Sequence, residues 1–223
     1  MSVKHLVLLS GGLDSTVMLA HIKDQYPEDA VTCVTINYGQ KHHKEIDLAL
    51  KIAAYYKCNS FCIPLAELFN SFNSALLMSN NKEIQNTLER GEVGNTYVPF
   101  RNGIFLSVLA GLADSHEYKG LWYGAHAEDA SNYPDCSKKF YNTMKDAIFF
   151  GTANNIVLTA PWINMYKAEI VAKGRALKVP FGMTWSCYNG REKACGVCPT
   201  CKGRLEAFKA NGIVDPLVYV GAI

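Results

Sequence analysis

The chain has 223 residues, a length that suits one large domain or one domain with a small appendage. Its formal net charge of +2 is too mild to argue for a nucleic-acid-binding face, and no stretch approaches the roughly 18 uninterrupted apolar residues of a membrane span. The apolar run at Leu6–Leu9 is too short for a secretory signal, so we expect a cytoplasmic protein without a nucleic-acid or membrane partner.

Short apolar strands alternate with helical patterns along most of the chain. Strands are predicted at 4–9, 31–37, 61–64, 121–124 and 156–159, and helices at 13–23, 43–56, 102–115, 137–150, 165–177 and 200–211. This alternation is typical of an α/β fold in which helices cover a parallel sheet. Residues 70–96 are rich in Asn and Ser and weakly periodic, which indicates an insertion or a mobile loop.

Residues 10–16 read Ser-Gly-Gly-Leu-Asp-Ser-Thr and join the first predicted strand to the first helix. Glycines let the backbone approach an anion closely, and the free amides at a helix N-terminus attract phosphate. Asp14 fits beside phosphates only if it binds Mg²⁺ or accepts a donor from the loop. The predicted phosphate-binding residues are Leu9, Ser10, Gly11, Gly12, Leu13, Asp14, Ser15 and Thr16.

Neither of two common nucleotide-binding motifs fits this loop. No Gly-Lys-Ser/Thr follows the glycines, which disfavours the Walker loop of an NTPase that transfers a γ-phosphate, and Gly-x-Gly-x-x-Gly is absent as well. The alternative without function is a tight turn at Gly11-Gly12 with Ser10 as a helix cap. Seven residues in this order, directly after the first strand, disfavour that alternative.

Four of the eight cysteines lie within fifteen residues, at Cys187, Cys195, Cys198 and Cys201. In a chain with no secretory signal, such clustering favours a metal over disulfides. Four thiolates suit tetrahedral zinc, and an iron–sulfur cluster is the rival. Because no ligand position is left open, we expect a structural site. A zinc ribbon that binds nucleic acid is the other alternative, but the basic residues that flank the cysteines are few.

Polar clusters interrupt the apolar pattern between the loop and the cysteines. Residues 38–42 (Tyr-Gly-Gln-Lys-His) and residues 124–129 (Gly-Ala-His-Ala-Glu-Asp) follow predicted strands, and ligands gather at the carboxyl ends of parallel strands. Residues 99–102 (Pro-Phe-Arg-Asn) precede a helix, with Asn102 as its expected N-cap, and Lys167 opens another. Each cluster taken alone is also consistent with a purely structural role.

The Ser-Gly-Gly-Leu-Asp-Ser loop resembles the pyrophosphatase loop of the N-type ATP pyrophosphatases, a superfamily that includes GMP synthetase, NAD synthetase and tRNA thiolation enzymes. The resemblance implies a parallel-sheet, adenine nucleotide alpha-hydrolase-like fold. It implies an ATP pyrophosphatase domain over residues 1–180, with a zinc-binding helical segment over residues 181–223. It also implies attack by a substrate oxygen on the α-phosphorus of ATP, with pyrophosphate leaving from the loop.

Taken together, the motifs resemble the 7-cyano-7-deazaguanine synthase family, often called QueC. Besides the loop, they are Tyr38-Gly39-Gln40 with His42, Arg101-Asn102, Tyr133-Pro134-Asp135-Cys136, Lys167-Ala168-Glu169-Ile170, Thr184-Trp185-Ser186-Cys187-Tyr188 and the Cys-Gly-x-Cys-x-x-Cys tail. This family implies conversion of 7-carboxy-7-deazaguanine, ammonia and ATP to 7-cyano-7-deazaguanine, AMP and pyrophosphate. It also implies one structural Zn²⁺, Mg²⁺ with the ATP, and a homodimer.

The resemblance implies roles for individual residues. Asp14, Lys167 and Arg101 are the implied catalytic residues, with Lys167 neutralising charge near the α-phosphate. The implied substrate-binding residues are Gln40, His42, Arg101, Asn102, Asp129, Tyr133 and Asp135. A carboxylate suits the N1–H and amino donors of a guanine-like edge, which favours Asp129 or Asp135 for that contact.

Three positions depart from the family pattern. Phe100 and Asn132 stand where the family commonly has Gly, and Ser137 stands where an Arg is usual. Larger side chains would narrow the pocket, and the missing Arg would remove a contact to carboxylate or phosphate. The alternatives are therefore another adenylating enzyme of the superfamily, such as a tRNA thiolase, or a relative that transfers a deazaguanine.

Overall fold

Five parallel strands form one sheet in the order β3-β2-β1-β4-β5. The strands are β1 (Lys4–Leu8), β2 (Ala30–Asn37), β3 (Asn59–Pro64), β4 (Gly120–Trp122) and β5 (Val157–Thr159). The computed structural model describes residues 3–87, 91–189 and 192–221. All five predicted strands are present, and the predicted parallel α/β class is confirmed.

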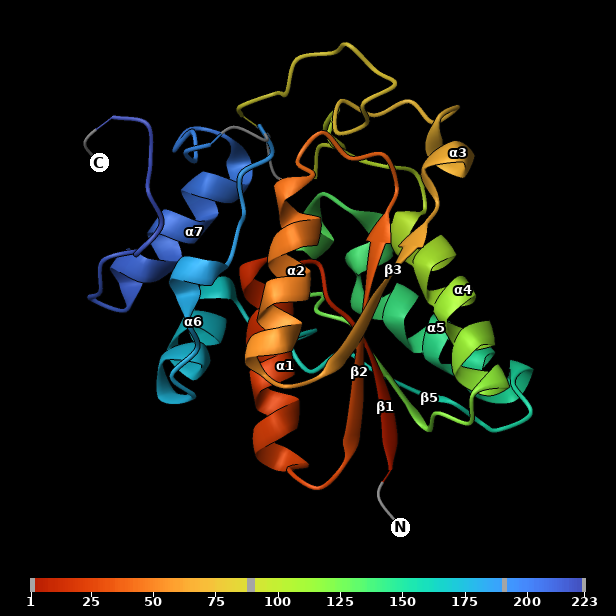
Figure 1. Cartoon of the computed structure of the whole chain (residues 1–223). Helices are drawn as coiled ribbons and strands as arrows, with labels where there is room; N and C mark the ends of the chain where they lie inside the picture. The colour runs from red at the N-terminus through yellow and green to blue at the C-terminus, as the bar shows by residue number, and fades with distance from the viewer. Residues whose placement is uncertain (1–2, 88–90, 190–191, 222–223) are drawn as a thin grey trace.

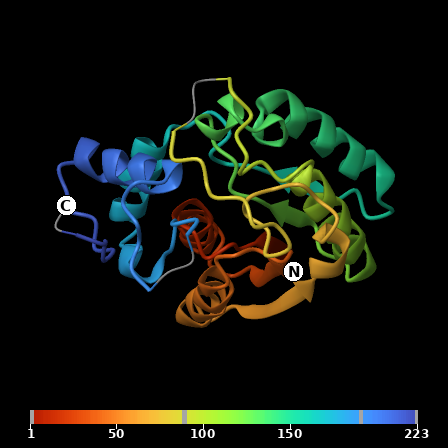
Figure 2. The same cartoon turned by 90° about the horizontal axis from the view of Figure 1, so that it is seen from above.

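Helices cover both faces of the sheet (Figures 1 and 2). They are α1 (Leu13–Gln25), α2 (Lys44–Tyr55), α3 (Ala66–Phe69), α4 (Arg101–Ser115), α5 (Lys138–Gly151), α6 (Lys167–Ala176) and α7 (Pro199–Ala210). One buried cluster joins the sheet to α1, α2, α6 and α7, and the other joins it to α4 and α5. The four-residue α3 has no sequence signal of its own, because it is shorter than one hydrophobic repeat.

The chain changes faces between β1 and β4. The connection from β1 to β2 runs through α1 on one face, whereas the connection from β4 to β5 runs through α5 on the other face. The loops that leave β1 and β4 therefore diverge and open a crevice at the carboxyl ends of the strands. The phosphate-loop motif follows β1, so it lies in this crevice.

Residues 70–87 and 91–96 cross the carboxyl ends of the strands, where Figure 1 draws them in yellow. These residues contain no helix or strand beyond an isolated bridge between Leu77 and Gln40. The segment is nevertheless packed in part, because Leu76 is fully buried in the core. The amide of Lys41 also donates to the carbonyl of Leu76 at 2.8 Å.

The C-terminal segment packs against the sheet domain through shared apolar and polar contacts. Ala207 and Phe208 of α7 belong to the same buried cluster as Val17 of α1. The amide of Trp185 donates to the carbonyl of Gly11 at 3.0 Å, so this segment also contacts the phosphate loop. The division near residue 180 stays a prediction. None of the helices in the described ranges combines the length and the hydropathy needed to cross a bilayer.

Candidate active site at the carboxyl ends of β1 and β4

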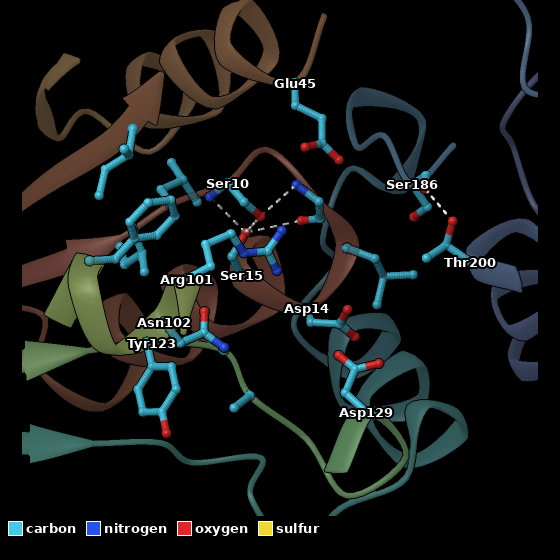
Figure 3. Close-up of a pocket in the computed structure, with 18 of the residues that line it drawn as sticks. Ser10, Asp14, Ser15, Glu45, Arg101, Asn102, Tyr123, Asp129, Ser186 and Thr200 are labelled. Atoms are coloured by element: carbon cyan, nitrogen blue, oxygen red, sulfur yellow. Dashed lines mark hydrogen bonds between the residues drawn. The ribbon is translucent and has the colours of Figure 1, made fainter. Parts of the chain in front are cut away.

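The phosphate loop is held by hydrogen bonds among its own hydroxyl and backbone groups. The hydroxyls of Ser10 and Ser15 lie 3.0 Å apart, and the Ser10 hydroxyl also accepts the amide of Gly12 at 3.2 Å (Figure 3). The Thr16 hydroxyl is buried and donates to the carbonyl of Gly12 at 2.7 Å. Gly12 precedes the first turn of α1, so the free amides of that turn face the crevice.

Gly11 needs to be glycine for two reasons. Its φ of +81° lies in the left-handed region, and a Cβ at this position would collide with the carbonyl oxygen of Glu45 in α2. This backbone is packed against α2 and leaves no room for a side chain.

We expect Gly11→Ala to lower the free energy of unfolding by about 2 kcal/mol and to raise the KM for ATP, because the loop must move away from α2. Urea denaturation and steady-state kinetics measure the two effects. The matched control is Gly111→Ala in α4, where a Cβ meets nothing within 4 Å. Equal stability of the two variants would show that the loop does not need this conformation.

Four charged or titratable groups meet beside the loop. Lys167 Nζ and His126 Nε2 each lie 3.7 Å from Asp14 Oδ2, and His126 Nε2 lies 3.2 Å from Asp129 Oδ2. Figure 3 shows the carboxylates of Asp14 and Asp129 facing each other. The segments after β1 and β4 and the start of α6 bring these residues together, although they are far apart in sequence.

Lys167 is buried and stays charged. Burial by itself would lower the pKa of Lys167, but the carboxylates of Asp14, Asp129 and Glu128 outweigh burial and raise that pKa above its ordinary value. Glu128 also accepts the backbone amide of Lys167 at 2.7 Å, which caps α6. The site therefore holds a fixed cation next to the free amides of the loop.

Several polar atoms of this site are buried without a hydrogen bond among the described residues. They are Oδ1 of Asp14, both ring nitrogens of His126, Nδ1 of His42 and the hydroxyl of Tyr123. Unsatisfied buried polar atoms cost free energy, so their concentration here is typical of a site that binds a polar ligand.

A cavity of about 210 Å³ opens from the loop along the ends of β1, β2 and β4. Arg101 reaches it from α4, and its guanidinium donates to the hydroxyl of Tyr38 at 3.1 Å. Burial would lower the pKa of Arg101, but Tyr38, Tyr188 and Asp135 raise it, so the group remains a cation. Predicted site residues that line this cavity are Leu9, Ser10, Gly12, Leu13, Asp14, Ser15, Gln40, His42, Arg101, Asn102, Asp129 and Lys167.

A second cavity of about 340 Å³ adjoins the first. Asp129, Lys167, Tyr188 and Thr200 line both cavities, whereas the predicted substrate residue Tyr133 lines the second alone. The predicted substrate residues are therefore divided between two spaces that meet at Lys167 and Asp129.

Some predicted residues serve the scaffold in this structure. The buried amide of Gln40 accepts the backbone N–H of Tyr38 at 2.9 Å and donates to the carbonyl of Ile36 at 3.3 Å, so it holds the turn after β2. Gly11 and Thr16 lie in the loop but do not line either cavity. Both residues shape the loop, Gly11 by packing on α2 and Thr16 by its hydrogen bond to Gly12. Their role in phosphate binding stays a prediction.

Asp135 is committed to the start of α4. Its carboxylate accepts the backbone amide of Asn102 at 2.8 Å, and it lines neither cavity. Asn102 was predicted to be the N-cap of this helix, and that prediction is wrong, because α4 already begins at Arg101. The acceptor for the first turn of α4 is the carboxylate of Asp135, 33 residues after Asn102. A cap supplied across the tertiary structure leaves no local sequence signal.

The structure accounts for the three departures from the family pattern. Phe100 has a φ of +51°, a conformation that favours glycine, but its exposed ring packs on Phe140 and lines neither cavity. Ser137 caps α5 by accepting the amide of Phe140 at 3.1 Å. Asn132 alone lines a cavity, the second one. The first cavity is therefore not narrowed at these positions.

Several residues of the first cavity had no role predicted from sequence. They are Glu45, Phe105, Tyr123, Trp185, Ser186, Tyr188 and Thr200. Trp185, Ser186 and Tyr188 belong to a motif that carried the family resemblance, so a signal existed for them. Glu45 lies on α2 and Tyr123 directly follows β4, and only the fold brings both to the first cavity.

The four predicted metal ligands converge. The Sγ atoms of Cys187, Cys195, Cys198 and Cys201 all lie within 4.8 Å of one another. A tetrahedral zinc ion with Zn–S bonds of about 2.3 Å needs sulfur atoms about 3.8 Å apart, so the cluster is consistent with zinc. Backbone amides of Asn189 and Cys195 point at the Cys187 sulfur at 3.4 and 3.3 Å, which suits a thiolate.

Comparison with known proteins identifies the family of this chain. The family described as "Queuosine biosynthesis protein QueC" matches residues 4–212. A 7-cyano-7-deazaguanine synthase from Caldicellulosiruptor bescii is 40% identical over 97% of this chain and 97% of its own length. One from Picrophilus torridus is 40% identical over 95% of this chain and 90% of its own length.

Solved structures with similar folds have low sequence identity to this chain. A U34-tRNA thiolase NcsA from Methanococcus maripaludis, solved with its [4Fe-4S] cluster, has a TM-score of 0.55 at 15% identity, over 93% of this chain and 65% of that protein. An NMN synthetase from Francisella tularensis has a TM-score of 0.52 at 15% identity, over 98% of this chain and 79% of that protein. At this identity the likeness shows the fold alone.

Proposed function

The chain belongs to the QueC family of 7-cyano-7-deazaguanine synthases, and we propose that it converts 7-carboxy-7-deazaguanine, ammonia and ATP to 7-cyano-7-deazaguanine, AMP and pyrophosphate. It is an ATP-dependent ligase of queuosine biosynthesis. The carboxylate is first adenylated and aminated to the amide. The amide oxygen is then adenylated in turn, and its departure with AMP leaves the nitrile.

The two halves of this reaction have the same requirement. In each, an oxygen of the substrate attacks the α-phosphorus of ATP, and negative charge builds up on the departing pyrophosphate. The amides and hydroxyls of Ser10, Gly12 and Ser15 would stabilise that charge at the N-terminus of α1. One site therefore serves both steps.

The position of the buried Lys167 is the main structural support for this proposal. It faces Asp14 at 3.7 Å and lies where both cavities meet, so an α-phosphate held there would be neutralised by a fixed cation. Arg101 would supply a second cation from α4. Asp14 and Asp129 offer the oxygen ligands that Mg²⁺ prefers, and Asp14 Oδ1 is buried with no hydrogen bond to the described residues. The ion would screen the phosphate charges.

The proposal is tested by incubating the protein with ATP, ammonium and 7-carboxy-7-deazaguanine and identifying the products by mass spectrometry. We expect the nitrile together with AMP and pyrophosphate, and the amide as an intermediate. AMP release that depends on a different carboxylate or amine, without nitrile or amide, would instead indicate a deazaguanine-transferring relative.

A tRNA thiolase is the other candidate, and it would need a cysteine that delivers sulfur. Cys136 lines the first cavity, but burial, Asp129 and Asp135 raise its pKa well above the ordinary value. The thiol is therefore protonated at neutral pH and is a poor nucleophile. This disfavours the thiolase.

Alkylation checks the state of this thiol. With iodoacetamide at pH 7.5, we expect Cys58 to react well before Cys136, because a hydrogen bond from the Cys33 thiol lowers the pKa of Cys58, which is also partly exposed. Peptide mass spectrometry over a time course gives the order. Labelling of Cys136 before Cys58 would indicate a reactive thiol in the first cavity and would favour the thiolase.

We further propose that the four cysteines hold one structural Zn²⁺. Four sulfurs within 4.8 Å suit a single ion better than a four-iron cluster, whose metal core would hold its thiolates farther apart. The ion would stabilise the 187–201 segment, which places Trp185 against the loop.

Cys201→Ser is expected to lower the zinc content from about one ion per chain and to lower the melting temperature, because a fully buried ligand is lost. Metal analysis by mass spectrometry and thermal unfolding measure both effects. Cys62→Ser, a substitution outside the cluster, is the control. Iron in place of zinc would contradict the assignment. The homodimer and the cytoplasmic location remain predictions.

A further inference from the structure

Two cavities meet at Lys167, and a reaction that joins ATP to a heterocyclic carboxylate needs two binding spaces. Resting on the function proposed above, we propose that the second cavity holds the deazaguanine ring of the acceptor and that Glu206 binds its N1–H and 2-amino edge. ATP then occupies the first cavity.

The phosphate loop excludes an arrangement in which the triphosphate of ATP lies in the second cavity. Ser10, Gly12, Asp14 and Ser15 line the first cavity, and no loop residue lines the second. The triphosphate must therefore lie in the first cavity with its pyrophosphate at the loop. An acceptor oxygen attacks the α-phosphorus from the side opposite the leaving pyrophosphate, so the acceptor approaches from beyond Lys167. The second cavity is the space on that side of the Lys167–Asp129 junction.

The second cavity offers carboxylates to a base that donates hydrogen bonds. Glu128, Asp129 and Glu206 line it, together with the cations of Lys167 and Lys202. A guanine-type ring presents two neighbouring N–H donors that pair with one carboxylate. The 7-carboxylate lies on the five-membered ring, whereas the N1–H and the 2-amino group lie on the six-membered ring. When the carboxylate lies at Lys167, these two donors therefore point away from Lys167 and into the second cavity.

Glu206 is the carboxylate that remains available for this edge. Glu128 accepts the amide of Lys167, and Asp129 faces His126 at 3.2 Å. Glu206 projects from α7 and makes no hydrogen bond or ion pair within the described ranges of the chain. Its side chain is thus free to turn toward a ligand.

Aromatic rings flank the same space. Tyr133 lines the second cavity, and its position is held by a 2.9 Å hydrogen bond to the Thr96 hydroxyl and by a stacked contact with Tyr97. Tyr188 lines both cavities. Flat rings held in place offer stacking surfaces to a planar base. The carbonyl of Asn86 accepts Lys202 Nζ at 3.1 Å, which ties the 70–96 segment to α7 beside this cavity.

Steady-state kinetics of AMP release by Glu206→Gln test the edge contact. We expect the KM for 7-carboxy-7-deazaguanine to rise by about 10- to 100-fold, the range for loss of hydrogen bonds to a charged group, with the KM for ATP changed less than about 2-fold. The matched control is Glu67→Gln, an exposed carboxylate on α3 that lines neither cavity.

The analogue that lacks the 2-amino group separates this contact from an indirect effect. Wild type should lose about 10-fold or more in kcat/KM with 7-carboxy-7-deazahypoxanthine, whereas Glu206→Gln should discriminate little between the two acceptors. Undiminished discrimination by the variant would overturn the role of Glu206.

A second variant tests the cavity without relying on Glu206. Among the described residues, none lies within 4 Å of a Cβ on Gly203 of α7. Gly203 lines the second cavity, so Gly203→Leu fills space there without displacing a described neighbour of that Cβ. We expect a higher KM for the acceptor and an unchanged KM for ATP. Gly111→Leu on α4, where a Cβ also meets nothing within 4 Å, is the control.

Outcomes for the two variants distinguish the assignments. A rise in the KM for ATP alone would place the adenosine in the second cavity, and unchanged kinetics in both variants would show that neither substrate binds there; either result overturns the inference. A wild-type protein that forms no nitrile from this acceptor would instead refute the proposed function itself, and the inference with it.

Discussion

Lys167→Met is expected to reduce the rate of AMP formation by about 10²- to 10³-fold, the usual cost of removing a preorganised group that stabilises transition-state charge. Methionine keeps the length of the side chain and removes its charge. In the variant, the carboxylates of Asp14 and Asp129 would lose the cation that lies beside them. The release of pyrophosphate in a coupled assay measures the rate.

Lys173→Met on the same helix is the control, since Lys173 lines neither cavity, and we expect its rate to stay within about 3-fold of wild type. Thermal unfolding of both variants separates a loss of chemistry from a loss of fold. A Lys167→Met enzyme that is folded and keeps more than a third of the wild-type rate would show that the α-phosphate is neutralised elsewhere.

Arg204→Met is expected to lower the free energy of unfolding by about 3–5 kcal/mol, because it strands a buried carboxylate. Arg204 is fully buried, and its guanidinium pairs with both oxygens of Asp215, at 2.6 and 2.9 Å. It also donates to the hydroxyl of Thr184 at 2.6 Å, one residue before the contact between Trp185 and the phosphate loop. Urea denaturation measures the loss, with the exposed Arg175→Met as control.

The same ion pair predicts a pH dependence of stability. Burial would raise the pKa of Asp215, but hydrogen bonds and charge from Arg204, together with the Tyr219 hydroxyl, lower it below its ordinary value. A folded-state pKa below the unfolded value of about 3.9 gives stability that is complete above pH 4 and is lost as the pH falls through the folded-state pKa. We expect Arg204→Met to lose this acid-dependent component. A variant whose stability matches that of wild type would contradict a stabilising role for the Arg204–Asp215 ion pair.

Local patterns carried most of the fold. The three inner strands, β1, β2 and β4, are short and largely apolar runs, and burial on both faces of a parallel sheet is what produces such runs. The edge strands β3 and β5 are partly exposed. The phosphate loop and the four-cysteine cluster could also be predicted from sequence, because the residues of each lie close together in the chain and their spacing limits their geometry. Such features depend on neighbours in the chain, so the sequence contains them directly.

Contacts between segments far apart in sequence could not be predicted from local patterns. The carboxylate of Asp135 accepts a backbone amide in the first turn of α4, although the local sequence had favoured Asn102 as the helix cap. Leu76 is buried in the core, although its segment has the composition of a loop. In both cases the partner lies far along the chain, and local propensity is overridden by packing.

The amino-acid sequence by itself determined the class of fold, the strand-to-helix loop of residues 10–16, the cysteine cluster and the family. Only the tertiary structure decided where the predicted substrate residues lie: Arg101 and His42 line the first cavity, Tyr133 lines the second, and Asp135 holds the start of α4. The physical reason is that a pocket forms where strand ends and helix starts from separate parts of the chain converge. Which side chains face that space depends on the packing of all of them.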